Sequence, residues 1–258
     1  MIYRIFAFTV LTAAMHGNAQ QIAAGQQLRP NDSLPKAADT KTDLPAEMRG
    51  DIMMARKMYR EAIELYKSVP AGSAIVSNKT GIGYHQLMDL SKAKKYYEIA
   101  LKLNPAYPEA INNLGTVFYA QKNYRRAVVL YKKALLITPN SASIHSNLGT
   151  AYFGRRNYQA AMESYQKALE LDPEVFEHRS SHGVLLQERT VTERAKFHYY
   201  LAKTYAKAGA SERALSYMRK ALEEGFKEKR KFMEEPEFAG LRELPEFQQL
   251  MTMETRVL

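Results

Sequence analysis

The sequence predicts an all-α solenoid of stacked antiparallel helix hairpins. Its clearest feature is a period of 34 residues, which places Gly81, Gly115 and Gly149 in register together with five further sets of residues. Within each period the apolar residues recur at the spacing of a helix face, and a turn separates two such faces. Hydrophobic residues make up 46% of the 258 residues and charged residues 25%, which excludes a wholly disordered chain. A single hairpin cannot bury its own apolar face, so successive hairpins are expected to stack.

Residues 1–19 are expected to form a secretory signal peptide. One positive charge, Arg4, precedes an uncharged and mostly apolar run over residues 5–15, and Ala19 puts a small residue at the expected cleavage site. That run is too short to span a bilayer as a helix, and the alternative is a buried N-terminal helix. Export would place the mature chain in the periplasm or outside the cell. No later stretch is long and apolar enough to predict a transmembrane segment.

Residues 20–45 are expected to be a disordered linker. They show no apolar periodicity and contain Pro30, Pro35 and Pro45. A solvated tether between the cleavage site and the folded body is the favoured interpretation.

The repeat is clearest in three consecutive units, 74–107, 108–141 and 142–175. Three consecutive units with the same pattern are a far more specific signal than one short motif. Six positions recur in all three units: Gly81, Gly115 and Gly149; Tyr84, Phe118 and Tyr152; Ala93, Ala127 and Ala161; Tyr97, Tyr131 and Tyr165; Ala100, Ala134 and Ala168; and Pro105, Pro139 and Pro173.

Residues 108–141 illustrate why each unit should fold as a hairpin. Gly115 on the first helix and Ala127 on the second are small, so the two helices can approach closely. Tyr131 fills the space beside them. Pro139 cannot continue the second helix, so the chain turns there and the next hairpin begins.

Less regular segments flank the three clear units. The last segment repeats Pro-Glu-Phe at Pro236 and Pro245, which suits two short helices whose Phe and Leu residues cover the end of the solenoid. The flanking segments are a degenerate first repeat at 46–73, an insert at 176–194, a degenerate repeat at 195–228, and capping helices with a tail at 229–258.

The three units resemble tetratricopeptide repeats, and the resemblance covers most of the mature chain. It implies a right-handed superhelical solenoid whose first helices line a concave groove for a protein or peptide segment, with no cofactor. In that family, ligand contacts commonly lie at the second, fifth, sixth, ninth and twelfth positions of a unit. Transferred to this sequence, they predict a peptide-binding groove of Asn78, Lys79, His85, Asn112, Asn113, Thr116, Tyr119, Asn147, Thr150, Phe153, Tyr199 and Lys203.

Asn113 and Asn147 lie one repeat apart and admit two interpretations. Each amide offers a donor and an acceptor, so the pair could hydrogen-bond the backbone of an extended peptide. Alternatively, both are structural, as asparagine at this position often is in these repeats. The carboxylate clamp by which some family members hold chaperone tails is not expected, because only Asn113 matches its pattern. Its other positions are occupied by Asn78, Ile82, Ser143 and Asn147.

The sequence favours a non-enzymatic scaffold or adaptor that binds a protein or peptide. An alternative is an assembly factor for an envelope complex that acts through the solenoid ends or through self-association. Another is binding of an anionic polymer through the basic stretch 195–231, which has ten basic and four acidic residues. No specific nucleic-acid binding is expected, since no recognised nucleic-acid module is present.

Enzymatic and metal chemistry have little support in the sequence. The chain has no cysteine, which excludes disulfides, thiolate metal sites and a cysteine nucleophile. No phosphate-binding Gly-rich loop and no nucleophile elbow is present. His178 and His182 are spaced to share a helix face, but no third ligand is specified, so no metal site is predicted.

Overall fold

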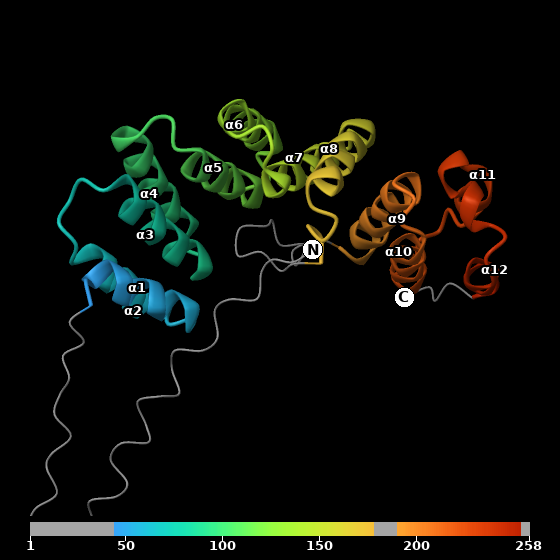
Figure 1. The fold of residues 1–258 in the computed structure, drawn as a ribbon, viewed down its shortest axis with the longest axis horizontal. Helices are drawn as coiled ribbons and strands as arrows, with labels where there is room; N and C mark the ends of the chain where they lie inside the picture. Colours follow the sequence, from blue (N-terminus) through green and yellow to red (C-terminus); the bar gives the residue numbers. More distant parts are fainter. Residues whose placement is uncertain (1–43, 178–189, 254–258) are drawn as a thin grey trace, which may run out of the picture. The chain divides into compact units, whose positions relative to one another are not determined.

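A computed structural model describes residues 44–177 and 190–253, and in this part of the chain every regular element is helical. The fold is an all-α solenoid of stacked antiparallel helix hairpins (Figure 1), as the sequence predicts. The helices are α1 (Ala46–Ala55), α2 (Tyr59–Lys67), α3 (Ala74–Gln86), α4 (Leu90–Leu103), α5 (Pro108–Ala120), α6 (Tyr124–Ile137), α7 (Ala142–Gly154), α8 (Tyr158–Leu171), α9 (Val191–Lys207), α10 (Ser211–Glu223), α11 (Arg230–Glu234), the 3₁₀ helix η2 (Pro236–Leu241) and α12 (Pro245–Thr252).

Consecutive helices from α1 to α10 pair as hairpins, and each hairpin packs against the next. The second helix of one hairpin contacts the first helix of the following one, as in α2 with α3 and α6 with α7. First helices also contact each other directly, α3 with α5 and α5 with α7. This stacking buries every residue from Ala110 to Phe118 of α5, because the helix has neighbours on several sides.

A short turn with one residue in the left-handed region joins the two helices of each hairpin. This residue is Lys57, Met88, Lys122 or Arg156 in the first four hairpins and Gly209 in the fifth. In three of these turns the next residue is an Asp or Asn that caps the second helix through its side chain, which satisfies an otherwise unbonded N–H. The bonds run to Asp89 from the Lys92 N–H, to Asn123 from the Arg126 N–H, and to Asn157 from the Ala160 N–H.

Each of the first four hairpins is held together by a glycine that faces a tyrosine ring. The glycine lies on the first helix and the tyrosine sixteen residues later on the second: Gly50 with Tyr66, Gly81 with Tyr97, Gly115 with Tyr131, and Gly149 with Tyr165. A Cβ atom at any of these glycines would lie only 2.4 to 2.7 Å from a ring carbon of its tyrosine. The helices therefore approach each other more closely than alanine would allow.

The fifth hairpin replaces this pair with Ala202 and Met218, both of them fully buried. Methionine is flexible and unbranched, so it can leave room for the Cβ of alanine where a rigid ring cannot. The two substitutions compensate for each other in size.

The last hairpin begins earlier than the sequence predicts. The insert was expected to run to Arg194, but α9 already begins at Val191. A capping box is the reason: Thr190 accepts a hydrogen bond from the N–H of Glu193, and the Glu193 carboxylate accepts one from the Thr190 N–H.

The C-terminal segment packs on the last hairpin, with η2 against α9 and α12 against α10. Phe232, Phe238, Phe247 and Leu250 are fully buried in the same apolar cluster as Met218. Two details differ from the expected pair of short helices. The first Pro-Glu-Phe sequence forms the 3₁₀ helix η2, and α11 precedes it.

Several sequence predictions concern residues outside the described part of the chain. These are the signal peptide at 1–19, almost all of the linker at 20–45, most of the insert, and the pair His178 and His182. Within the described residues, no helix is both long and apolar enough to cross a membrane.

We expect Gly115→Ala to lower the stability of the protein. The new methyl group would lie 2.7 Å from the Tyr131 ring, and overpacking of this kind costs roughly 1–3 kcal/mol. The midpoint of urea unfolding, followed by circular dichroism, measures the effect.

The matched control is Gly240→Ala, because a Cβ at Gly240 has no atom within 4 Å. The double variant Gly115→Ala/Tyr131→Met copies the fifth hairpin and should recover much of the loss. A Gly115→Ala protein as stable as the control would contradict this account of the hairpin.

Candidate peptide-binding face

The twelve predicted groove residues lie on the first helices of four hairpins, α3, α5, α7 and α9. We call the side of these helices that carries the twelve residues the first-helix face. Four of the twelve are partly exposed: Lys79, His85, Tyr119 and Lys203. The other eight are buried: Asn78, Asn112, Asn113, Thr116, Asn147, Thr150, Phe153 and Tyr199.

Asparagine side chains link α3, α5 and α7 through hydrogen bonds. Asn113 donates from Nδ2 to Oδ1 of Asn78 at 3.0 Å, and Asn147 donates in the same way to Asn112 at 3.0 Å. Asn112 donates to Asn113 at 3.4 Å and so joins the two bonds into one chain. All four side chains are buried, so the bonds satisfy polar groups that water cannot reach. The amides hold successive first helices together, and their contact with a peptide stays a prediction.

These bonds follow a simple rule of position. The residue two before a hairpin's glycine bonds the residue three before the glycine of the preceding hairpin. Asn113 and Asn78 obey this rule, and so do Asn147 and Asn112. The sequence leaves both a peptide contact and a structural role open for Asn113 and Asn147, but it does not predict that they bond Asn78 and Asn112. Polar residues at the same two places in consecutive units were the signal that could have revealed their mutual bonding.

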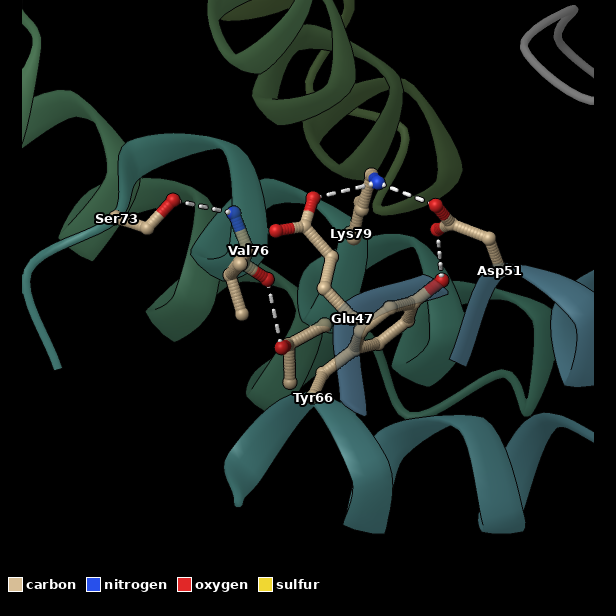
Figure 2. A network of polar contacts seen from close by, with 7 residues as sticks. Glu47, Asp51, Tyr66, Ser73, Val76 and Lys79 are labelled. Carbon is tan, nitrogen blue, oxygen red and sulfur yellow. Dashed lines mark hydrogen bonds and ion pairs between the residues drawn. The ribbon is translucent and has the colours of Figure 1, made fainter. Parts of the chain in front are cut away.

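At the N-terminal end of the solenoid an ion pair replaces the amide pair, because Lys79 and Glu47 occupy the same two positions (Figure 2). The Lys79 ammonium lies 2.8 Å from Glu47 Oε1 and 2.7 Å from Asp51 Oδ2. Tyr66 on α2 donates a hydrogen bond of 2.8 Å to Asp51 Oδ1. One lysine thus connects α3 to α1, and through Asp51 to α2.

The environment keeps these groups in the protonation states that the network needs. Burial raises the pKa of Tyr66 well above its usual range, and the hydrogen bond to Asp51 raises it further. For Lys79, burial lowers the pKa, but the hydrogen bonds to Asp51 and Glu47 more than offset this, so the pKa is raised. Lys79 stays positively charged and Tyr66 stays a donor at neutral pH.

A row of ring side chains crosses the first-helix face at one register. His85, Tyr119 and Phe153 follow each other at 34-residue intervals on α3, α5 and α7. The Tyr119 ring packs at 5.2 Å against Tyr124, while Phe153 meets Phe197 of α9 edge to face at 5.6 Å. His85 and Tyr119 remain partly exposed and Phe153 does not, so the row is accessible only at its first two members.

The two predicted groove residues of α9 contact the chain's own C-terminal segment. The Lys203 ammonium lies 2.9 Å from Glu235 Oε2 and 3.4 Å from Glu237 Oε1. Tyr199 donates a hydrogen bond to Glu235, and burial followed by this bond raises the pKa of Tyr199 far above its usual value. The sequence predicts that the C-terminal segment covers the end of the solenoid, but it does not predict these polar contacts.

No group of three or more His, Asp or Glu side chains that could hold a metal ion occurs among residues 44–177 and 190–253. The polar groups of the first-helix face are amides, hydroxyls and paired ions. Most of these groups bond one another or form ion pairs, so a peptide contact would depend mainly on the partly exposed His85 and Tyr119.

We expect Asn113→Ala to destabilise the protein. It removes the donor to Asn78 and the acceptor for Asn112, and each buried group left without a partner costs about 1–3 kcal/mol. Asn140→Ala, at an exposed position, serves as the control and should leave the urea midpoint unchanged. Equal midpoints for the two variants would show that the amide chain contributes nothing to stacking.

The stability of the protein should fall as the pH drops below about 6.5, the ordinary pKa of histidine, partly because of His85. Burial lowers the pKa of His85, so the unfolded chain takes up a proton more readily than the folded one. The loss of stability begins near the pKa of His85 in the unfolded chain and levels off below the lower pKa of His85 in the folded protein. Unfolding midpoints measured from pH 7.5 down to pH 5 should decline less in His85→Gln than in the parent protein, and parallel curves would refute the assignment.

Family comparisons agree with this geometry. A sequence model described as tetratricopeptide repeat matches residues 142–175, one described as TPR repeat matches 115–155, and a further tetratricopeptide repeat matches 84–107. These matches fall on the α3–α4, α5–α6 and α7–α8 hairpins. No curated protein sequence matches the chain.

Among solved structures, the chain is similar to several of the protein MamA. One is 20% identical with a TM-score of 0.48, and the match covers 68% of this chain and 93% of MamA. A second, MamA from Desulfovibrio magneticus RS-1, is 22% identical with a TM-score of 0.49, covering 69% of this chain and 92% of that one.

Proposed function

Since this chain is a tetratricopeptide-repeat protein, we propose that it is an interaction scaffold that holds a peptide or extended protein segment against its first-helix face. The observation that carries the proposal is the bonded series of first helices. Lys79, Asn113 and Asn147 each reach back to the preceding hairpin, so adjacent first helices are tied together before any ligand arrives. A surface ordered in advance loses little conformational entropy on binding.

The accessible part of this face offers groups suited to a peptide. His85 and Tyr119 lie one repeat apart and can contact successive side chains of an extended segment. Glu109 adds an exposed negative charge next to Tyr107, whereas the Lys79 charge is paired with Glu47 and Asp51. Burial raises the pKa of the Tyr107 phenol, whose hydroxyl interacts with Asn78. The proposed role needs no cofactor and no catalytic group.

Location outside the cytoplasm is part of the proposal and rests on the signal-peptide pattern of residues 1–19. The partner would then be a protein or peptide that is itself exported.

The basic stretch 195–231 is less suited to an anionic polymer than its composition suggests, because internal contacts occupy many of its charges. Arg213 pairs with Glu174, and Lys203 pairs with Glu235 and Glu237. Further members pair with acidic side chains: Arg219 with Glu246, Arg230 with Glu234, and Lys231 with Glu228.

Peptides selected from a random display library on the immobilised protein test the proposal. We expect the double variant His85→Ala/Tyr119→Ala to bind the selected peptides at least about tenfold more weakly, since an aromatic contact in a binding site contributes 1 kcal/mol or more on loss. The matched control is Gln159→Ala/Lys167→Ala, two exposed positions on the second helix α8. Peptides that bind the test variant and the parent equally well would place the site elsewhere, and failure to select any peptide would argue against the scaffold role.

A further inference from the structure

Helix α6 has an exposed basic side that the proposed peptide-binding role does not use. The helix contains four basic residues and no acidic one between Tyr124 and Ile137. Arg125, Lys132 and Lys133 are exposed, and no acidic side chain in the described part of the chain pairs with them. The Lys132 ammonium lies 5.7 Å from the centre of the Tyr152 ring on α7. This differs from the last hairpin, where most basic side chains have acidic partners.

Two large aliphatic side chains project from the same side of α6. Val129 is 65% exposed and Leu136 is 86% exposed, more than any other large hydrophobic residue of the described chain. Together with the three cations they follow at intervals of three or four residues, so all five lie on one helical face. We call Arg125, Val129, Lys132, Lys133 and Leu136 the α6 outer face.

The inward side of α6 explains why these residues have no role in the core. Ala127, Val128, Tyr131 and Ala134 are buried against α5 and α7, which satisfies the packing needs of the hairpin. The outer face is therefore not required for the fold. The exposed aliphatic side chains lower solubility, and the neighbouring cations without acidic partners repel one another. Both features have a cost for the free protein, which indicates a use outside the fold.

We propose that the α6 outer face docks on a lipid surface that carries anionic headgroups. Lysine and arginine at such a surface attract the headgroups, and aliphatic side chains on the same face enter the boundary between headgroups and acyl chains. The long lysine stems allow the ammonium groups to stay among the phosphates while Val129 and Leu136 are buried.

The composition of the face favours lipid over the two other partners that positive charge could attract. Protein interfaces are enriched in aromatic residues and depleted in lysine, whereas the five residues of this face include two lysines and no aromatic residue, and the ring beside Lys132 belongs to Tyr152 of α7. A soluble polyanion would have no use for Val129 and Leu136. Only a surface that is anionic outside and apolar beneath matches both kinds of side chain.

Fluorescence from a single cysteine on the outer face tests the proposal in the full chain. The natural protein has no cysteine, so a polarity-sensitive dye such as NBD attached to Val129→Cys reports from that position alone. We expect its emission to move to shorter wavelength with vesicles of phosphatidylcholine and phosphatidylglycerol in equal parts. Pure phosphatidylcholine vesicles should give no such change, and neither should soluble polyphosphate. The same dye on Gln159→Cys of α8 should stay unchanged with all three.

Charge reversal then tests which residues dock. Adding Lys132→Glu/Lys133→Glu to the labelled chain should raise the anionic lipid concentration needed for half the change at least about tenfold, since each basic residue near such a surface contributes roughly fivefold. The control Lys207→Glu/Lys227→Glu makes the same change in net charge at exposed positions of the last hairpin and its following loop, and should have a smaller effect.

Three results would overturn the proposal. The first is an unshifted label on α6 with anionic vesicles, which would show that any binding by the chain leaves this face in water. The second is an equal effect of the two charge-reversal pairs, which would show that the attraction depends only on the net charge of the protein. The third is an equal shift with polyphosphate, which would make a soluble polyanion the partner.

Discussion

The close contact between a glycine and a tyrosine ring is the constraint on which the rest of the structure depends. Because Gly115 carries no side chain, α5 and α6 approach until the Tyr131 ring lies against the backbone of α5. Three other hairpins repeat the contact, which gives successive hairpins the same internal geometry. Only hairpins of the same geometry can stack in a regular series. The pair Ala202 and Met218 supports this explanation, because the ring is absent where a Cβ is present.

Polar bonds between hairpins add specificity to this apolar packing. Apolar surfaces tolerate small shifts, whereas a buried amide that loses its partner is strongly penalised, so the bonds define how one first helix lies against the next. The chemistry changes along the chain, from Lys79 with Glu47 to Asn113 with Asn78. At α9, Lys203 and its acidic partners join the last hairpin to the capping segment. The same bonds that order the stack would also order a surface for a peptide.

The two proposed surfaces lie on different helices of the same repeats. The peptide-binding proposal uses first helices, chiefly α3 and α5, and the lipid proposal uses the outer side of a second helix, α6. The first and second helices of a hairpin are separate elements, so a ligand on one need not compete with a ligand on the other. Ion pairs with acidic side chains of the same chain distinguish the basic stretch 195–231 from the basic residues of α6. Residues 195–231 are the most basic stretch in the sequence, but half of their ten basic side chains pair with acidic side chains, whereas no such pair involves α6 in the described part of the chain.

The sequence by itself determined the class of fold, the hairpin repeat and the positions of the core. Few other folds are compatible with glycine, alanine, tyrosine and proline at a constant period. The small residues allow two helices to approach, the tyrosine fills the space beside them, and the proline ends the second helix. It could not decide which polar residues of the first helices face a ligand. An asparagine in the sequence looks the same whether its side chain bonds a peptide or another asparagine. Only the distance between neighbouring first helices shows that these side chains bond one another, as in Asn113 with Asn78 and Asn147 with Asn112. The tertiary structure likewise decided that Glu235 meets Lys203, and that Val129 and Leu136 stay in water, because both depend on which helices pack together.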